Sequence, residues 1–329
     1  MSLFSSKIQN VIGPGIIFAG AAIGGSHLMS STTAGARFGF SLIVLILITN
    51  FLKYPFLLVG TRFTASTGMT LLEGFKKRNS LYLPIFLIIS LVTGTFTIAA
   101  VSFVSGVLLT NIPLFSNFPP MDLSIMVLVI CGFILIFGKY KALDNLSKIL
   151  VSLLTILTFF AVISLLINGS LNNDLTATFF NPETSPWRLS NLSFLIPLMG
   201  WMPCPVELCV WPSLWMFSKN KESKYRPTVQ EAEFDFNLGY LITIITAIFF
   251  VTLGAITMYG TGDGMLSGSG VSFAQNLIKL YTESIGEWSK WVIIPASFAA
   301  MFSTTLTCLD AYPRSISSIQ GLLRGTDLG

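Results

Sequence analysis

The sequence predicts an all-α integral membrane protein, and three observations lead to that fold class. Apolar residues make up 53% of the 329 residues, charged residues only 10%, and the mean hydropathy is +0.75. Soluble domains carry about 25% charged residues, so this chain has too few charges to cover a globular surface. The apolar residues also gather into stretches of the roughly 20 residues that a helix needs to cross a bilayer. A soluble enzyme is therefore excluded.

Eight stretches qualify as membrane spans, and together they form one transmembrane domain over residues 1–329. In chain order they cover residues 12–34, 40–63, 83–109, 121–138, 147–167, 192–217, 237–259 and 288–310. Most connections between them are short. The two longer ones, 168–191 and 260–287, are rich in Gly, Asn, Ser and Pro, which favour loops.

Positive charges predict a multi-pass protein of the cell (inner or plasma) membrane with a cytoplasmic N-terminus. In that orientation thirteen Lys and Arg residues fall on the cytoplasmic side and four on the outer side. This is the bias that sets the topology of membrane proteins. The remaining two, Lys53 and Arg62, fall inside the second span.

Charge and cysteine content exclude several other classes of partner. The net charge of +4 is spread over loops and forms no basic patch with aromatics, so no nucleic-acid binding is expected. The four cysteines lie inside apolar stretches and predict no disulfide: Cys131, Cys204, Cys209 and Cys308. We expect membrane lipid and a small ion or solute as partners and no cofactor, while the oligomeric state is left open.

The first and sixth spans are interrupted by helix-breaking residues. The first begins Gly13-Pro14-Gly15 and contains Gly24-Gly25, and the sixth contains the run MPCP at residues 202–205. Secondary transporters build substrate and ion sites from such broken helices, and a separation of five spans fits two inverted five-helix repeats. The alternative is a pair of kinked helices, since Gly and Pro are common in membrane spans.

The text of the first span, GPGIIFAGAAIGGSHLMSSTTAGARFGFS at residues 13–41, resembles the NRAMP family of divalent metal transporters. That family opens with GP, breaks its first helix at DPGN and continues with an AGA-R-aromatic-G stretch. Residues 24–27 stand at the DPGN position, and residues 34–41 (AGARFGFS) match the stretch that follows. The Met-Pro-His break of the family's sixth helix reads Met202-Pro203-Cys204 here.

This chain departs from the family at the residues that hold metal. The resemblance implies ligands at the Asp and Asn of the first break and the Met of the sixth, where Gly24, His27 and Met202 stand here. Ser26 lies between the first two, and Cys204 replaces the family's His. By ligand type, His, Met and Cys suit soft or borderline metals such as Mn, Fe, Cu or Zn. His27, the only histidine in the sequence, is otherwise interpreted as a hydrogen-bonded packing residue or as an acceptor of a coupling proton.

Two further ionisable residues lie in or near the breaks. Glu207 follows Cys204 by one helical turn and is a candidate to replace the missing carboxylate. Its alternative is a structural pair, with Lys53 of the second span or with a backbone donor. Charged residues inside membranes are costly to bury and are functional candidates for that reason.

The eighth span carries Ser303 and Thr304, and later Asp310. In transporters that this sequence resembles, hydroxyls of that span complete a Na⁺ site with carbonyls of the broken first helix. The competing interpretation is that the hydroxyls bond their own helix backbone. Asp310 precedes Arg314 by four residues, which predicts an ion pair near the membrane surface.

The expected function is that of a secondary active transporter, a symporter for a divalent metal driven by H⁺ or Na⁺, with the metal as substrate between the breaks. A small organic solute such as an amino acid is the second hypothesis, because without the Asp the Gly24-Gly25 amides are free to hold a carboxylate. A receptor or a remnant that does not transport is the third. The family's ninth and tenth spans do not appear before Gly329, so the chain is expected to be C-terminally incomplete.

Overall fold

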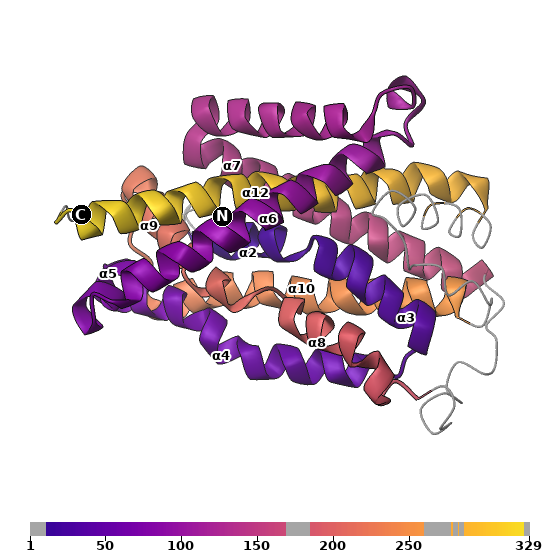
Figure 1. Ribbon diagram of the computed structural model, residues 1–329, viewed down its shortest axis with the longest axis horizontal. Helices are drawn as coiled ribbons and strands as arrows, with labels where there is room; N and C mark the ends of the chain where they lie inside the picture. Colours follow the sequence, from indigo (N-terminus) through magenta and orange to yellow (C-terminus); the bar gives the residue numbers. More distant parts are fainter. Residues whose placement is uncertain (1–10, 169–184, 260–277, 279–281, 283–285, 326–329) are drawn as a thin grey trace, which may run out of the picture.

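The computed structural model describes residues 11–168, 185–259, 278, 282 and 286–325, and these residues are almost entirely helical (Figure 1). The elements are α2 (Pro14–Ala22), the π-helix η1 (Ser26–Ser31), α3 (Thr32–Phe38), α4 (Ile43–Thr67), α5 (Leu71–Arg78), α6 (Tyr82–Leu109), η2 (Pro113–Phe115), α7 (Pro120–Asn168), η4 (Leu189–Asn191), α8 (Leu192–Trp201), η5 (Val206–Cys209), α9 (Trp211–Ser223), α10 (Val229–Met258), η6 (Glu287–Ser289) and α12 (Lys290–Leu323).

Six helical segments in the described part of the chain are long and apolar enough to cross a membrane. They are Ile43–Thr67, Tyr82–Leu109, Pro120–Ile167, Leu189–Cys209, Val229–Met258 and Glu287–Leu323. The predicted spans at 121–138 and 147–167 both lie in α7, whose backbone leaves helical geometry at Lys139 (φ 49°, ψ −148°). Figure 1 shows α7 turning back on itself between two arms. The count of eight separate spans stays a prediction.

One predicted boundary is wrong. The last span was expected to end at residue 310, but α12 continues to Leu323 because Tyr312, Ile319 and Leu322 are buried in the core. The basic run at residues 76–78 closes the short helix α5. That helix begins with a capping box, in which the side chain of Thr70 and that of Glu73 each accept a hydrogen bond from the other residue's backbone amide.

Small residues let α2 and α3 approach α10 closely. A Cβ on Gly15 would lie 2.0 Å from the carbonyl oxygen of Asp235, and one on Gly239 would lie 1.9 Å from that of Gly15. Further along, a Cβ on Gly35 would lie 2.1 Å from Val251 O. Such small-residue contacts are how membrane helices pack without a hydrophobic driving force between them. They place the first interrupted segment against the middle of the helix bundle.

Candidate functional site

The first interruption separates α2 from η1. The last residue of α2 is Ala22, and Ile23 leaves helical geometry (φ −82°, ψ 75°) before the π-helix starts at Ser26. Gly24 packs against α12 so closely that a Cβ there would lie 2.5 Å from Thr304 Oγ1. The glycine at the family's Asp position is therefore required by its neighbour in this structure.

The second interruption follows α8. That helix ends at Trp201, and Met202 is extended (φ −86°, ψ 127°) before the short helix η5 starts at Val206. Prolines at 203 and 205 supply no backbone N–H, which prevents a continuous helix.

Lys53 occupies the carbonyl end of α8. Its ammonium donates to the carbonyl oxygens of Met199 (2.7 Å), Gly200 (2.6 Å) and Cys204 (3.2 Å). The last carbonyls of a helix have no intrahelical donor, and a cation there also interacts favourably with the helix dipole. Lys53 thus stabilises the break, and the expected pair with Glu207 is not among the ion pairs of the described residues.

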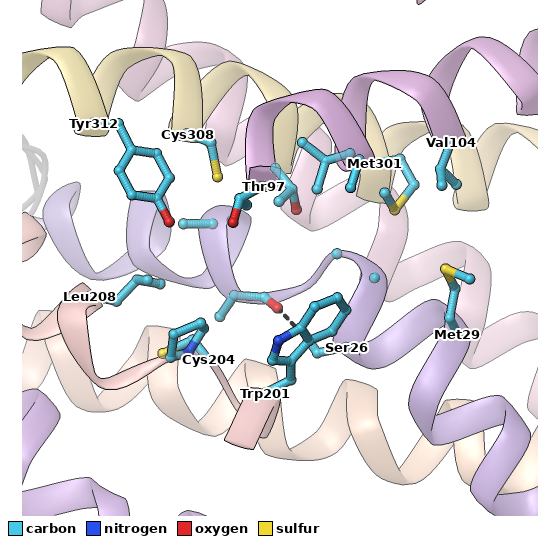
Figure 2. A pocket seen from close by; sticks show the side chains of 18 of the residues that line it. Ser26, Met29, Thr97, Val104, Trp201, Cys204, Leu208, Met301, Cys308 and Tyr312 are labelled. Atoms are coloured by element: carbon cyan, nitrogen blue, oxygen red, sulfur yellow. Dashed lines mark hydrogen bonds between the residues drawn. The ribbon is translucent and has the colours of Figure 1, made fainter. Parts of the chain in front are cut away.

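A cavity of about 100 Å³ lies between the two interruptions (Figure 2). Two of its walls come from the residues around the interruptions: Gly24, Gly25, Ser26 and Met29 around the first, and Trp201, Cys204, Pro205, Leu208 and Trp211 around the second. The other walls come from Thr97, Ala100, Val101 and Val104 of α6 and from Met301, Thr304, Cys308 and Tyr312 of α12. Apolar and aromatic groups dominate this lining. Its polar side chains are hydroxyls, thiols and two indoles, and it contains no carboxylate or imidazole.

Of the predicted substrate residues, Gly24, Ser26 and Cys204 line this cavity together, while His27 and Met202 face elsewhere. His27 is fully buried, with Nε2 3.0 Å from the carbonyl oxygen of Thr243 and Nδ1 2.8 Å from Ser26 Oγ. Because a carbonyl only accepts, Nε2 carries the hydrogen, and Nδ1 lies against Ser26 Oγ, which is also 2.9 Å from the carbonyl oxygen of Ala22. Neither ring nitrogen is free to bind a metal.

Met202 is buried in a separate apolar cluster between α3, α4, α8 and α10. The hydroxyl of Ser31 lies 3.9 Å from its sulfur. Within the described residues, no group of three or more His, Cys, Asp and Glu side chains is arranged to hold a metal ion. The structure therefore brings Cys204 to the cavity but does not assemble the His27, Met202 and Cys204 set around one point.

Glu207 lies just behind the cavity. Its Oε1 accepts a hydrogen bond of 3.0 Å from the hydroxyl of Tyr312, and Tyr312 itself lines the cavity. Asp310 forms the expected ion pair with Arg314 at 2.5 Å, which confirms that prediction, and it also accepts from the indole of Trp215 at 2.9 Å. Asp310 is thereby occupied by structural contacts.

The two hydroxyl residues of α12 face the first interruption. Thr304 Oγ1 lies 3.0 Å from the carbonyl oxygen of Gly20, 3.2 Å from that of Ile23 and 3.1 Å from that of Ala300. Ser303 Oγ is buried without a hydrogen-bond partner among the described residues, and a Cβ on Gly20 would lie 2.5 Å from it. The single hydrogen of the Thr304 hydroxyl can bond to only one of these three carbonyl oxygens at a time. Several oxygen lone pairs therefore lie close together at this point.

Sequence reasoning missed most of the cavity wall. Met301, Thr304, Cys308 and Tyr312 recur at helical spacing along one face of α12, and that periodicity was the available signal. This periodicity does not stand out in the sequence, because the residues on all faces of the span are similarly apolar or small. Trp211 also lines the cavity and meets Tyr312 edge to face with ring centroids 4.9 Å apart.

A buried polar cluster also fastens the start of α2. The carboxylate of Asp235 on α10 accepts from the backbone amides of Gly13 (2.9 Å) and Gly15 (2.7 Å). Lys219 on α9 donates to the carbonyl oxygen of Ile12 at 2.6 Å and lies 3.4 Å from Asp144 on α7. These contacts join four helices at the end of the bundle where the chain enters α2.

A helical protein with a cavity between two interrupted segments has the architecture of a membrane transporter. The natural resistance-associated macrophage protein-like (Nramp) family matches residues 15–322. An uncharacterised protein of Pasteurella multocida (strain Pm70) is 38% identical over 314 residues, covering 95% of this chain and 71% of that protein. The chain therefore belongs to the Nramp family, whose members are transporters and not enzymes, and the resemblance that residues 13–41 indicated is confirmed.

Solved structures of the Eremococcus coleocola manganese transporter share the fold. The complex with an aromatic bis-isothiourea substituted compound matches with a TM-score of 0.69 and 14% identity, over 99% of this chain and 68% of that one. A histidine-to-alanine mutant of the same transporter matches with a TM-score of 0.63 and 14% identity, over 94% and 68% of the two chains. The fold is thus that of a multi-pass membrane protein with an Nramp-like transporter core.

Proposed function

We propose that this protein is a secondary active transporter of a small organic solute, which it holds in the cavity between the interruptions after α2 and α8. The eight proposed spans are the α2–η1–α3 segment, α4, α6, the two arms of α7, the α8–η5–α9 segment, α10 and α12. The proposed location is the cell membrane, with the N-terminus in the cytoplasm, because that orientation places most of the positively charged loop residues on the cytoplasmic side.

The composition of the cavity wall supports an organic solute as the substrate. A divalent ion in a membrane site needs negative or strongly polar ligands to replace its hydration. The wall offers neither a carboxylate nor an imidazole, and His27 is turned away toward Thr243. Apolar and aromatic walls with a few convergent polar groups instead suit an organic ligand. A volume of about 100 Å³ limits the solute to a small organic molecule.

A divalent metal is the second candidate, and the family supports it. The Eremococcus coleocola protein of the same fold is named a manganese transporter. Cys204 and Cys308 line the cavity here and bring soft sulfur ligands to it. Figure 2 nevertheless shows these thiols at one end of the cavity and the thioethers of Met29 and Met301 toward the other, which is a dispersed and not a clustered ligand set.

The coupling ion we propose is Na⁺, bound near Ser303 and Thr304. The carbonyl oxygens of Gly20, Ile23 and Ala300 and the two hydroxyls together offer oxygen ligands without net charge. Unwound backbone carbonyls of a broken helix are a recurrent Na⁺ ligand in secondary transporters. Proton coupling is the alternative, and it would leave uptake indifferent to Na⁺ but dependent on a pH gradient.

The test is uptake into proteoliposomes. Leucine and Mn²⁺ are offered separately with and without a Na⁺ gradient, with Mg²⁺ and Ca²⁺ as competitors of Mn²⁺ and a His27→Ala variant alongside. We expect saturable, Na⁺-driven leucine entry and no Mn²⁺ entry. Saturable Mn²⁺ entry that is lost in His27→Ala would overturn the proposal in favour of metal. Entry of neither, in folded protein, would favour the remnant.

A further inference from the structure

Glu207 is a carboxylate just behind the cavity wall, and no Lys or Arg of the described residues forms an ion pair with it. It lies in η5, directly after the second interruption, and it is half-buried. The ion pairs of the described residues join Arg62 to Glu233, Asp144 to Lys148 and Lys219, and Asp310 to Arg314, and Glu207 belongs to none of them.

The nearest charged groups on the neighbouring helices are engaged elsewhere. Lys53 on α4 is held by three carbonyl oxygens, including that of Cys204. Asp310 and Arg314 on α12 bind each other. A carboxylate accepts about four hydrogen bonds, and the described residues supply Glu207 with one, from Tyr312. The Glu207 carboxylate can therefore still bind a positively charged group.

Tyr312 connects this carboxylate to the cavity. Its hydroxyl donates to Glu207 Oε1 at 3.0 Å, and the side chains of Thr97 and Thr93 on α6 also hydrogen-bond to the phenol oxygen. Figure 2 shows this hydroxyl directed into the cavity from α12, on the same side as Cys308. A hydroxyl that donates to a carboxylate becomes a better acceptor, because hydrogen bonds in a chain polarise one another.

Aromatic rings surround the same end. Trp211 packs edge to face on Tyr312, and Trp201 lines the wall opposite α12. Aromatic faces attract organic cations, by roughly 2 kcal/mol or more when the pair is desolvated. They do not replace the six to eight oxygen ligands of a hard metal ion. The combination favours an organic ammonium over a bare dication.

We propose that Glu207 and Tyr312 recognise an ammonium group of the solute, so that the transported compounds are amines or amino acids and not simple organic anions. This inference rests on the proposed function, because it assigns the substrate class of the same cavity. Glu207 supplies the compensating charge, Tyr312 supplies the acceptor at the wall, and Trp201 and Trp211 supply the aromatic faces.

The test compares three probes with one branched carbon body. Leucine carries both charged groups, isopentylamine only the ammonium and isocaproate only the carboxylate. Binding to purified protein is followed by quenching of intrinsic tryptophan fluorescence, since Trp201 and Trp211 line the cavity. We expect leucine and isopentylamine to bind and Glu207→Gln to weaken both by about tenfold or more, with isocaproate unaffected.

Two further variants separate recognition from folding. Tyr312→Phe keeps the ring and removes the hydroxyl, and we expect it to weaken isopentylamine binding less than Glu207→Gln does. Glu233→Gln removes a carboxylate that pairs with Arg62 away from the cavity, and it should leave all binding unchanged. Isocaproate binding as tightly as isopentylamine, with no effect of Glu207→Gln, would overturn the ammonium assignment and leave the organic-solute function standing. Failure of all three probes to bind would overturn that function, and this assignment with it.

Discussion

A single substitution at the carboxylate that holds the start of α2 should cost much of the protein's stability. The first amides of a helix have no intrahelical acceptor, and at α2 a carboxylate from another helix supplies one. Asp235 is 3% exposed and accepts from Gly13 and Gly15, and Pro14 between them has no amide to satisfy. Each hydrogen bond to a charged group contributes about 1.5–3 kcal/mol, so Asp235→Ala should destabilise the protein by about 3–6 kcal/mol.

The assay is thermal unfolding of the purified protein in detergent, followed by tryptophan fluorescence. At about 2–4 °C per kcal/mol, the expected fall in Tm for Asp235→Ala is about 6–24 °C. Asp235→Asn retains one acceptor oxygen and should fall between the alanine variant and the parent. Glu233→Gln, on the same helix but in a more exposed pair with Arg62, should change stability by at most about 1 kcal/mol. An alanine variant as stable as the parent would refute the reasoning.

Three more outcomes follow from the site. Gly24→Asp should lower Tm and confer no Mn²⁺ uptake, because its Cβ would lie 2.5 Å from Thr304 Oγ1, and adding Thr304→Ala should recover part of the Tm. Lys53→Met should lower Tm by leaving three carbonyls without a donor, about 1–3 kcal/mol for each that stays buried and unsatisfied, whereas Lys53→Arg should restore part of the loss. A thiol reagent should modify Cys204 at the cavity more slowly when a transported solute is bound, while its reaction with Cys209, which is partly exposed and does not line the cavity, stays unchanged.

Most of the helical framework could be predicted from the sequence, because hydropathy alone decides where a chain can enter lipid. The predicted interval 83–109 differs from α6 by one residue at its start, and 121–138 and 147–167 fall within the two arms of α7. The error in the predicted spans lies at a helix end whose position hydropathy does not determine. α12 continues past 310 because Tyr312 and Leu322 find partners in the core, and long-range packing of that kind leaves no local pattern.

The site was less predictable, because its composition depends on the direction of side chains at irregular backbone. His27 follows the first interruption inside a π-helix, so a regular helical projection does not give its direction, and it points to α10. A pair with Glu207 was one alternative for Lys53, but its ammonium donates instead to the carbonyl oxygens of Met199, Gly200 and Cys204. Glu207, behind the cavity wall, accepts from Tyr312.

The contact between Gly24 and Thr304 links the lost carboxylate to the rest of the site. If the chain were a metal transporter that had merely lost one ligand, space for an Asp side chain would remain at position 24. That space is filled by Thr304, whose hydroxyl lies 2.5 Å from where a Cβ would be and bonds to the carbonyls of Gly20 and Ile23. A carboxylate appears instead at Glu207, on the opposite interrupted segment and behind Tyr312. A tyrosine hydroxyl stands between this carboxylate and the cavity, and the proposed recognition of an ammonium group rests on that arrangement.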